Sequence, residues 1–167
     1  NADHTALIEY QRRHRGWKGL IVTSANCSTT QLALALKPLQ VAFGLRKLLV
    51  VTMQAISGAG HPGVPSLDIL GNVVPYIGGE EDKMEVESRK LLGRLGDDGI
   101  AAAEMVVSAH CNRVPVRDGH MECISVEYEA KPGMEEAMAA LEEFRGADSA
   151  RGLPSTPEQP IVVRREA

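Results

Sequence analysis

The sequence predicts an α+β domain in which helices cover one face of a mixed, largely antiparallel sheet. The order of the apolar patterns carries this prediction, because they follow one another as helix, strand, helix, strand, helix, strand, strand, helix. The helical segments are too few to cover both faces of one sheet. We therefore expect the second face to pack against another copy of the chain and form a homodimer.

The first half of the chain predicts two helices and two strands. A polar helix is expected over residues 4–15, followed by a strand over residues 17–23. Residues 28–43 have the apolar spacing of a helix, which Pro38 is expected to end or kink because its ring removes a backbone hydrogen bond. Residues 48–56 are almost uniformly apolar, which predicts a strand buried on both faces.

The second half predicts a charged amphipathic helix over residues 80–95 and a strand over residues 105–111. Residues 121–129 alternate between apolar and polar side chains, which is typical of an antiparallel sheet with one wet face. A helix over residues 134–145 and a short strand over residues 161–163 are expected to complete the domain.

Composition excludes several classes of function. The net charge of −4 does not favour binding to nucleic acid or to an anionic membrane. The sequence also has no apolar run long enough to cross a bilayer. Three cysteines without a C-x-x-C pair form no disulfide framework, and with the five histidines they make no zinc signature, so no metal is expected. Sparse cysteine use fits a reducing compartment, and we expect a cytoplasmic protein.

Cys27 is the residue around which a function is expected. It lies between a predicted strand end and a predicted helix start, where unpaired N–H groups and the helix dipole favour an anion and therefore a nucleophilic thiolate. Ser28, Thr29 and Thr30 add hydroxyls suited to capping that helix. The alternative is a small buried hydrophobic residue, as most lone cysteines are.

Three further polar side chains stand out. Gln54 ends an apolar run, where its amide could orient a reacting carbonyl or simply bond the backbone. Arg113 could hold a carboxylate and His120 could transfer protons near neutral pH, although a surface Arg and a turn His are the alternatives. His110 competes as a base but is expected to lie in a buried strand. A thiolate, a base, an amide and an arginine together would form a thiol acyl-transfer site for an anionic substrate.

Four motifs make the sequence similar to a known family. In chain order they are NCST at 26–29, MQAISGAG at 53–60, GGEEDK at 78–83 and CNRVPVRDGH at 111–120. Together they resemble the aspartate-semialdehyde dehydrogenases, in the branch found in fungi and archaea. The resemblance covers nearly the whole chain, and four motifs in the family's order are highly specific.

The resemblance implies a role for each matching residue. Cys27 would be the acyl-forming nucleophile, His120 the general acid/base, and Gln54 the residue that orients the intermediate. Arg113 would clamp the substrate carboxylate. The remaining matches are Asn26, Glu80 and Lys83 for substrate binding, and Ser57 and Gly58 for the loop beside the nicotinamide.

The resemblance also implies the reaction and the domain organisation. The reaction would be NADPH-dependent reductive dephosphorylation of β-aspartyl phosphate to aspartate semialdehyde, which feeds lysine, methionine and threonine synthesis. Residues 1–167 would form one catalytic and dimerisation domain, like the C-terminal domain of glyceraldehyde-3-phosphate dehydrogenase-like enzymes. The family's N-terminal NADP-binding domain and C-terminal return segment are absent, so the chain alone is expected to be inactive.

Three other readings remain open. An acyl-CoA reductase, such as a malonyl-CoA reductase, would keep Cys27 and His120 but replace the amino-acid clamp, against which Glu80 with Lys83 argues weakly. The chain could instead be a non-catalytic dimerisation module. It could also be a structural domain with an unreactive cysteine.

Overall fold

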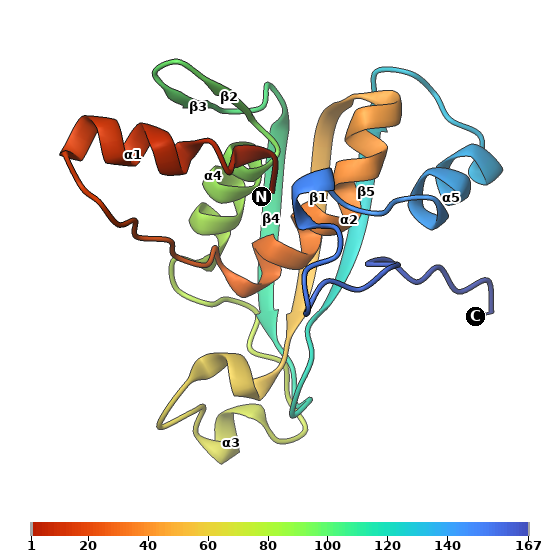
Figure 1. Ribbon diagram of the computed structural model, residues 1–167. Coiled ribbons are helices and arrows are strands. Elements are labelled where there is room, and N and C mark those ends of the chain that lie inside the picture. The colour runs from red at the N-terminus through yellow and green to blue at the C-terminus, as the bar shows by residue number, and fades with distance from the viewer. Residues whose placement is uncertain (1, 167) are drawn as a thin grey trace.

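A mixed three-stranded sheet forms the centre of the computed structural model, which describes residues 2–166 (Figure 1). The central strand β1, Leu45–Gln54, pairs in parallel with β4, Val106–Arg113, and antiparallel with β5, Met121–Tyr128. A two-stranded antiparallel hairpin, β2 at Arg94–Gly96 and β3 at Gly99–Ala101, stands apart from this sheet. The predicted mixed α+β class is therefore confirmed.

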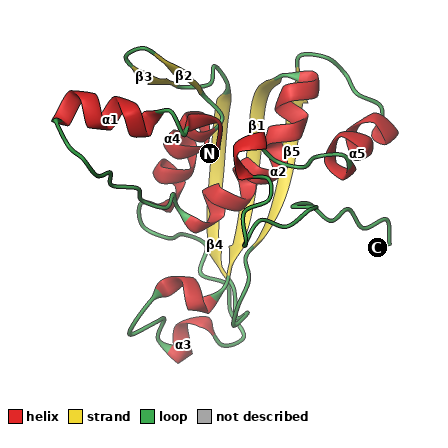
Figure 2. Cartoon of the chain, viewed as in Figure 1, coloured by secondary structure: helices red, strands yellow, loops and turns green. Residues whose placement is uncertain are grey.

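Helices cover one face of the sheet, as predicted (Figures 1 and 2). Helix α2, Cys27–Phe43, lies along β1, and α4, Glu80–Leu91, lies along β4. Helix α5, Met134–Glu142, packs beside α2. The other helical segments are η1 at Ala2–His4, α1 at Leu7–Arg15, η2 at Ile56–Ala59, α3 at Ser66–Ile69 and η3 at Asp148–Ala150.

The core lies between the sheet and helices α2 and α4. Leu32 and Leu36 recur at helical spacing on α2 and are fully buried, as are Leu48 on β1 and Met84 on α4. Burial of these side chains holds α2, and with it the first residue of the helix, against the sheet. None of the helices in residues 2–166 is both long and apolar enough to cross a membrane.

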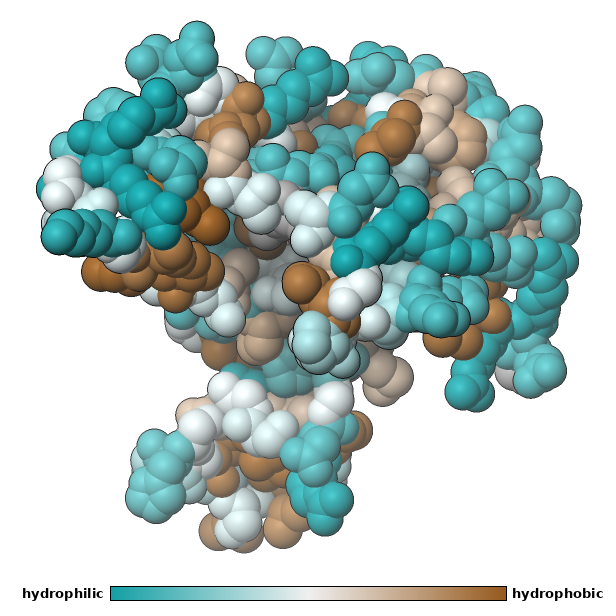
Figure 3. Space-filling view, in the orientation of Figure 1, coloured by the Kyte–Doolittle hydropathy of each residue, from teal (hydrophilic) through white to brown (hydrophobic). Residues whose placement is uncertain are grey.

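The predicted strand at 17–23 is absent, and the segment runs as an exposed loop. A strand needs a neighbour to complete its backbone hydrogen bonds, and no strand among the described residues pairs with it. The Gln11 side-chain amide bonds the N–H and C=O of Ile21 instead. Val22 is 75% exposed, and Figure 3 shows apolar surface gathered below α1, where this segment lies.

Two expectations about α2 and β1 are also wrong. Pro38 lies inside α2, which continues to Phe43, because the buried leucine stripe holds both halves of the helix although one hydrogen bond is missing. Strand β1 is not buried on both faces, since its side chains alternate and Leu49 and Val51 are exposed. The sheet has a second face that no helix of the described residues covers.

The other boundaries differ locally. Helix α4 ends at Leu91 rather than at residue 95, because Gly93 passes so close to the Ala101 carbonyl that no side chain would fit there. The chain then enters the β2–β3 hairpin. The sequence analysis did not predict this hairpin, because the helical pattern was extended to residue 95. Residues 161–163 form no strand. Residues 1 and 167 of the predicted domain lie outside the described part.

Candidate active site

Cys27 is the first residue of α2, and its side chain is exposed. The helix is capped by Asn26, whose Oδ1 accepts hydrogen bonds from the N–H groups of Ser28 at 3.0 Å and Thr29 at 3.1 Å. The expectation that residues 28–30 provide the cap is therefore wrong. The thiol stands at the positive end of the helix dipole, as the sequence predicts.

His120 lies just before β5 and reaches the thiol. Its Nε2 is 3.2 Å from Cys27 Sγ, and its Nδ1 accepts a hydrogen bond from the Ala55 N–H at 3.0 Å. Burial of the ring and the nearby charge of Arg113 lower the pKa of His120, against a smaller opposing effect of Glu80. The imidazole is therefore held in its neutral form at neutral pH.

Arg113 is the last residue of β4 and is only 6% exposed. Its Nη1 donates to the Ala55 carbonyl at 2.8 Å. One residue, Ala55, therefore bonds both Arg113 and His120 through its main chain. Main-chain groups carry no residue-type signal, so the sequence offered no means of finding this link.

A carboxylate network stands beside the thiol. Asn26 Nδ2 donates to Glu80 Oε2 at 2.6 Å, and Lys83 Nζ donates to Glu80 Oε1 at 3.1 Å. Burial alone would raise the pKa of Glu80, but hydrogen bonds from Asn26, Lys83 and Gln54 outweigh it and lower that pKa. Glu80 also raises the pKa of Lys83, so this pair is charged at neutral pH.

Gln54 and Glu87 extend the network. Gln54 is buried at the end of β1, where it bonds Glu80 and donates to Thr52 Oγ1 at 3.4 Å. Glu87 accepts a 2.7 Å hydrogen bond from the Asn26 N–H and was missed by the sequence reasoning. Its seven-residue spacing from Glu80 places both on one face of α4, which is a signal that could have found it.

The turn at Ser57 and Gly58 lies against the same residues. Ser57 donates its main-chain N–H to the Arg117 carbonyl at 3.0 Å. A Cβ added to Gly58 would lie 2.8 Å from His120 Cε1 and 3.0 Å from Arg113 Nη1. The structure thus links eight of the nine predicted site residues through direct contacts or adjacent positions in the chain. Ser57 precedes Gly58, but its N–H bonds Arg117 rather than another site residue.

Gly58→Ala is expected to displace His120 and slow alkylation of Cys27 by up to about tenfold, the effect of losing the His120 hydrogen bond altogether. The measurement is the rate of Cys27 alkylation by iodoacetamide, with turnover as a second readout. Gly19→Ala is the matched control, because a Cβ at Gly19 meets open space. Equal rates for the two variants would contradict a tight contact between the turn and His120.

His110 lies elsewhere. It is exposed rather than buried, and it pairs with Val51 on the uncovered side of the sheet. Cys111, its neighbour, is buried beside Met84, and burial raises the pKa of its thiol. Neither residue belongs to the candidate site. Among the described residues no group of three or more His, Cys, Asp or Glu could hold a metal ion.

Glu122 is a half-buried carboxyl group under α2. It is opposite Thr52 in the sheet, and its Oε1 is buried without a hydrogen-bond partner among the described residues. Burial raises the pKa of Glu122 to about 7, against the opposing effect of a hydrogen bond from Gln31. The sequence reasoning missed this residue. Alternation along a strand predicts which face of the sheet a side chain is on, but not how far that side chain is shielded from water.

Glu122→Gln is expected to stabilise the protein above pH 7 by about 1–2 kcal/mol, after allowance for solvent screening of a partly exposed group. The folded pKa near 7 exceeds the ordinary 4.5, so the unfolded chain loses its proton first. The free energy of unfolding therefore falls as pH rises between those values. Urea unfolding at pH 4 and pH 8 measures this difference.

The exposed Glu104→Gln is the control for that series and should show no such pH dependence. A Glu122→Gln variant that gained nothing at pH 8 would mean that the buried carboxylate is satisfied by a partner, such as water.

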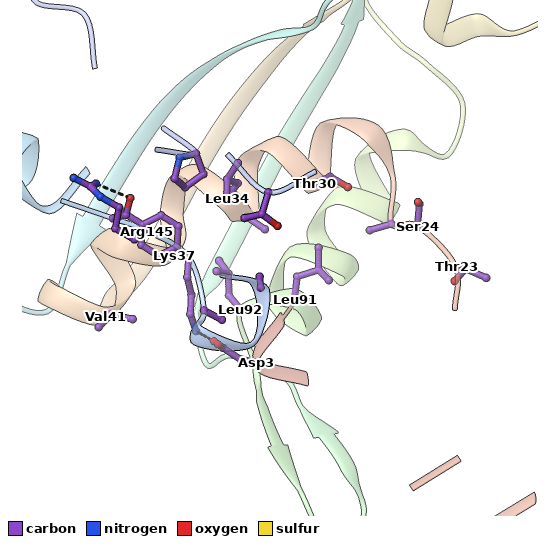
Figure 4. Close-up of a pocket in the computed structure, with 18 residues that line it drawn as sticks. Asp3, Thr23, Ser24, Thr30, Leu34, Lys37, Val41, Leu91, Leu92 and Arg145 are labelled. Carbon is purple, nitrogen blue, oxygen red and sulfur yellow. Dashed lines mark hydrogen bonds and ion pairs between the residues drawn. The ribbon is translucent and has the colours of Figure 1, made fainter. Parts of the chain in front are cut away.

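A cavity of about 680 Å³ lies along the outward face of α2 and does not include the site (Figure 4). Thr30, Leu34, Lys37 and Val41 line it from α2. Leu91, the last residue of α4, and Leu92, which follows it, line the other side. Lys37 forms a 2.6 Å ion pair with Asp3 at its edge. Neither Cys27 nor His120 lines this cavity, so it is separate from the candidate site.

Fold and site together define a mixed α/β domain that holds a cysteine–histidine pair at the start of a helix, beside a buried arginine. A family model, "Semialdehyde dehydrogenase, dimerisation domain", matches residues 36–167. The chain belongs to this family. The matched range contains His120, Arg113 and the Glu80–Lys83 pair, while Cys27 precedes it.

Individual relatives agree with the family. The chain is 52% identical to aspartate-semialdehyde dehydrogenase of Archaeoglobus fulgidus over 99% of this chain and 47% of that protein. A structure of aspartate semialdehyde dehydrogenase with NADP from Candida albicans matches at TM-score 0.82 and 42% identity, over 95% of this chain and 47% of that chain.

The Vibrio cholerae aspartate semialdehyde dehydrogenase II complexed with ASA matches at TM-score 0.65 and 29% identity, over 87% of this chain and 51% of that chain. The resemblance to the archaeal and fungal enzymes is confirmed. The chain spans about half the length of the relatives it matches.

Proposed function

We propose that the chain is the catalytic and dimerisation domain of an aspartate-semialdehyde dehydrogenase. The enzyme would reductively dephosphorylate β-aspartyl phosphate to L-aspartate 4-semialdehyde for amino-acid biosynthesis. The observation that carries the proposal is the 3.2 Å approach of Cys27 Sγ to His120 Nε2 at the start of α2. The names of the relatives point to the same substrate.

Cys27 provides the covalent step. Its sulfur attacks the acyl carbon of the β-aspartyl phosphate, and phosphate leaves with the electron pair of the broken C–O bond, so that a thioester forms. NADPH, when bound, supplies the hydride that reduces this thioester. Release of the aldehyde then breaks the C–S bond and returns the electron pair to sulfur. His120 Nε2 lies beside Cys27 Sγ, where this bond forms and breaks.

The charged residues around the thiol suit an amino-acid substrate. Arg113 donates one Nη1 hydrogen bond to Ala55, and its remaining N–H groups provide the fork that binds a carboxylate. Glu80 would receive the substrate ammonium group, and Lys83 would bind the phosphate. Asn26 holds Glu80 in place at 2.6 Å, so this carboxylate is oriented before substrate arrives.

Ser57 and Gly58 fit one edge of a nicotinamide. Gly58 has no Cβ and lies directly against His120, so this turn reaches the Cys27–His120 pair with its main chain. These two residues would hold only a small part of NADP. We therefore propose that an N-terminal NADP-binding domain and a C-terminal return segment complete the enzyme, and that the 167-residue chain alone turns over negligibly.

The test is NADP-dependent oxidation of aspartate semialdehyde in the presence of phosphate, measured for the 167-residue chain and for the full-length enzyme. We expect activity only in the full-length enzyme. A rate for the isolated chain near that of the full-length enzyme would contradict the domain proposal. Malonyl-CoA reduction is assayed in parallel, and a preference for the CoA ester would favour the acyl-CoA reductase instead.

The uncovered sheet face is the proposed dimer interface. Leu49, Val51, Val106 and Met121 share this face by strand register and are 40–61% exposed. Exposed apolar side chains gathered on one sheet face are typical of an interface between subunits. The family description names a dimerisation domain, which supports a second copy as the partner.

Val51→Asp is expected to weaken dimerisation about tenfold or more, because it places a charge on the central strand of that face, where the second copy would bury it. Sedimentation velocity over a concentration series measures the shift from dimer to monomer. Val86→Asp, the same change at an exposed position on α4, should leave the dimer intact. A wild-type protein that stays monomeric at high concentration would contradict the interface.

A further inference from the structure

Ala55 is bonded to two charged or titratable side chains of the candidate site. It follows β1 and is fully buried, with φ −69° and ψ 156°. Its N–H donates to His120 Nδ1 at 3.0 Å, and its carbonyl accepts from Arg113 Nη1 at 2.8 Å. The main chain of one residue therefore fixes the orientation of the imidazole and of the guanidinium.

The hydrogen bond from Ala55 determines where the imidazole proton lies. A main-chain N–H is always a donor, so Nδ1 must offer its lone pair and carries no proton. In a neutral imidazole the proton is then on Nε2. Nε2 is the atom 3.2 Å from Cys27 Sγ, so the ring directs an N–H at the sulfur rather than a lone pair.

The surroundings of the ring disfavour a second proton. A proton on Nδ1 would point at the Ala55 N–H. Two donors would then face each other at 3.0 Å with no acceptor between them, which is unfavourable. Arg113 from β4 adds a positive charge nearby, and Glu80 from α4 is the opposing negative charge. Burial and Arg113 prevail and lower the pKa of His120, which agrees with the geometric argument.

We propose that Ala55 is a positioning residue that locks His120 as its neutral Nε2–H tautomer, so that His120 serves Cys27 as a hydrogen-bond donor and not as the base that removes the thiol proton. The Cys27 proton leaves to water, to which the exposed thiol has access. In the reaction, which rests on the proposed function, the same N–H donates to the substrate oxygen as it gains negative charge. A neutral imidazole used in this way is an established catalytic device.

The direct test is a long-range ¹H–¹⁵N spectrum of the protein labelled with ¹⁵N-histidine. His120→Gln identifies the His120 resonances, and His110→Gln removes a different set as the control. We expect an unprotonated Nδ1 and a protonated Nε2 at neutral pH, with a coupling across the hydrogen bond between the Ala55 amide nitrogen and Nδ1. An Nδ1–H tautomer or an imidazolium at neutral pH would overturn the proposal.

Alkylation of Cys27 by iodoacetamide gives an independent test that needs no enzymatic activity. If His120 only donates, His120→Ala should react about tenfold more slowly near neutral pH, whereas His120→Gln, which keeps an N–H donor, should stay within about threefold of wild type. The wild-type rate should rise with pH in one step. An additional acid-side step that both variants abolish would instead show a thiolate–imidazolium pair and refute the donor role.

These readouts separate the two proposals. A neutral Nε2–H tautomer in a protein that does not oxidise aspartate semialdehyde would leave the role of Ala55 standing and overturn the proposed function. An active full-length enzyme with an imidazolium at His120 would support the proposed function and overturn the role of Ala55.

Discussion

Cys27→Ser is expected to reduce turnover of aspartate semialdehyde by the full-length enzyme about 10³-fold or more. The serine hydroxyl would occupy the same place at the start of α2 and could still accept the His120 hydrogen bond. It is far less acidic than a thiol, however, and the alkoxide needed for attack is scarcely populated at neutral pH. Substrate binding should change little, because Arg113 and Glu80 are untouched.

Cys123→Ser is the matched control. Cys123 is exposed on β5 and pairs with Val51 on the uncovered face, away from α2. This variant should retain wild-type turnover, and neither variant should change the free energy of unfolding by more than about 0.5 kcal/mol. Turnover by Cys27→Ser within tenfold of wild type would show that Cys27 forms no covalent intermediate.

The start of α2 was predicted to within one residue because its signals are local, although the cap was assigned to residues 28–30 instead of Asn26. Asn26 bonds N–H groups only two and three residues away, and the leucine stripe repeats within one helix. Short-range signals of this kind survive without knowledge of the tertiary fold. The position of Cys27 at the helix N-terminus follows from them.

The strand expected at 17–23 shows the opposite case. Residues 20–22 are apolar and suited to a strand, but a strand exists only where a neighbour pairs with it. That neighbour is not among the described residues, so Ile21 bonds the Gln11 side chain instead. A local pattern cannot reveal whether a partner strand is present.

The site was predicted as a set of residues but not as a connected structure. The motifs indicated Cys27, Arg113 and His120, while their spatial contacts depend on the β4–β1–β5 order of the sheet. The link through Ala55 depends on main-chain groups, which every residue possesses. Sequence therefore indicated which chemistry was available, and only the fold showed which way the His120 proton points.

Leu36→Ala is expected to lower the free energy of unfolding by about 3 kcal/mol, within the range of about 2–5 kcal/mol typical of buried leucines. Leu36 is 1% exposed and packs in the cluster that joins α2 to β1 and α4. The rigid sheet and α4 on either side leave little scope for the cavity to collapse. Urea unfolding with an unchanged m-value measures the loss.

Leu34→Ala is the control on the same helix, since Leu34 is 42% exposed and faces the cavity on the outer side of α2. It should cost less than about 1 kcal/mol. The pair also tests what holds the thiol in place, because α2 carries Cys27 at its first residue. If Leu36→Ala cost no more than Leu34→Ala, the position of the thiol would have to come from the Asn26–Glu80 and Asn26–Glu87 hydrogen bonds instead of the core.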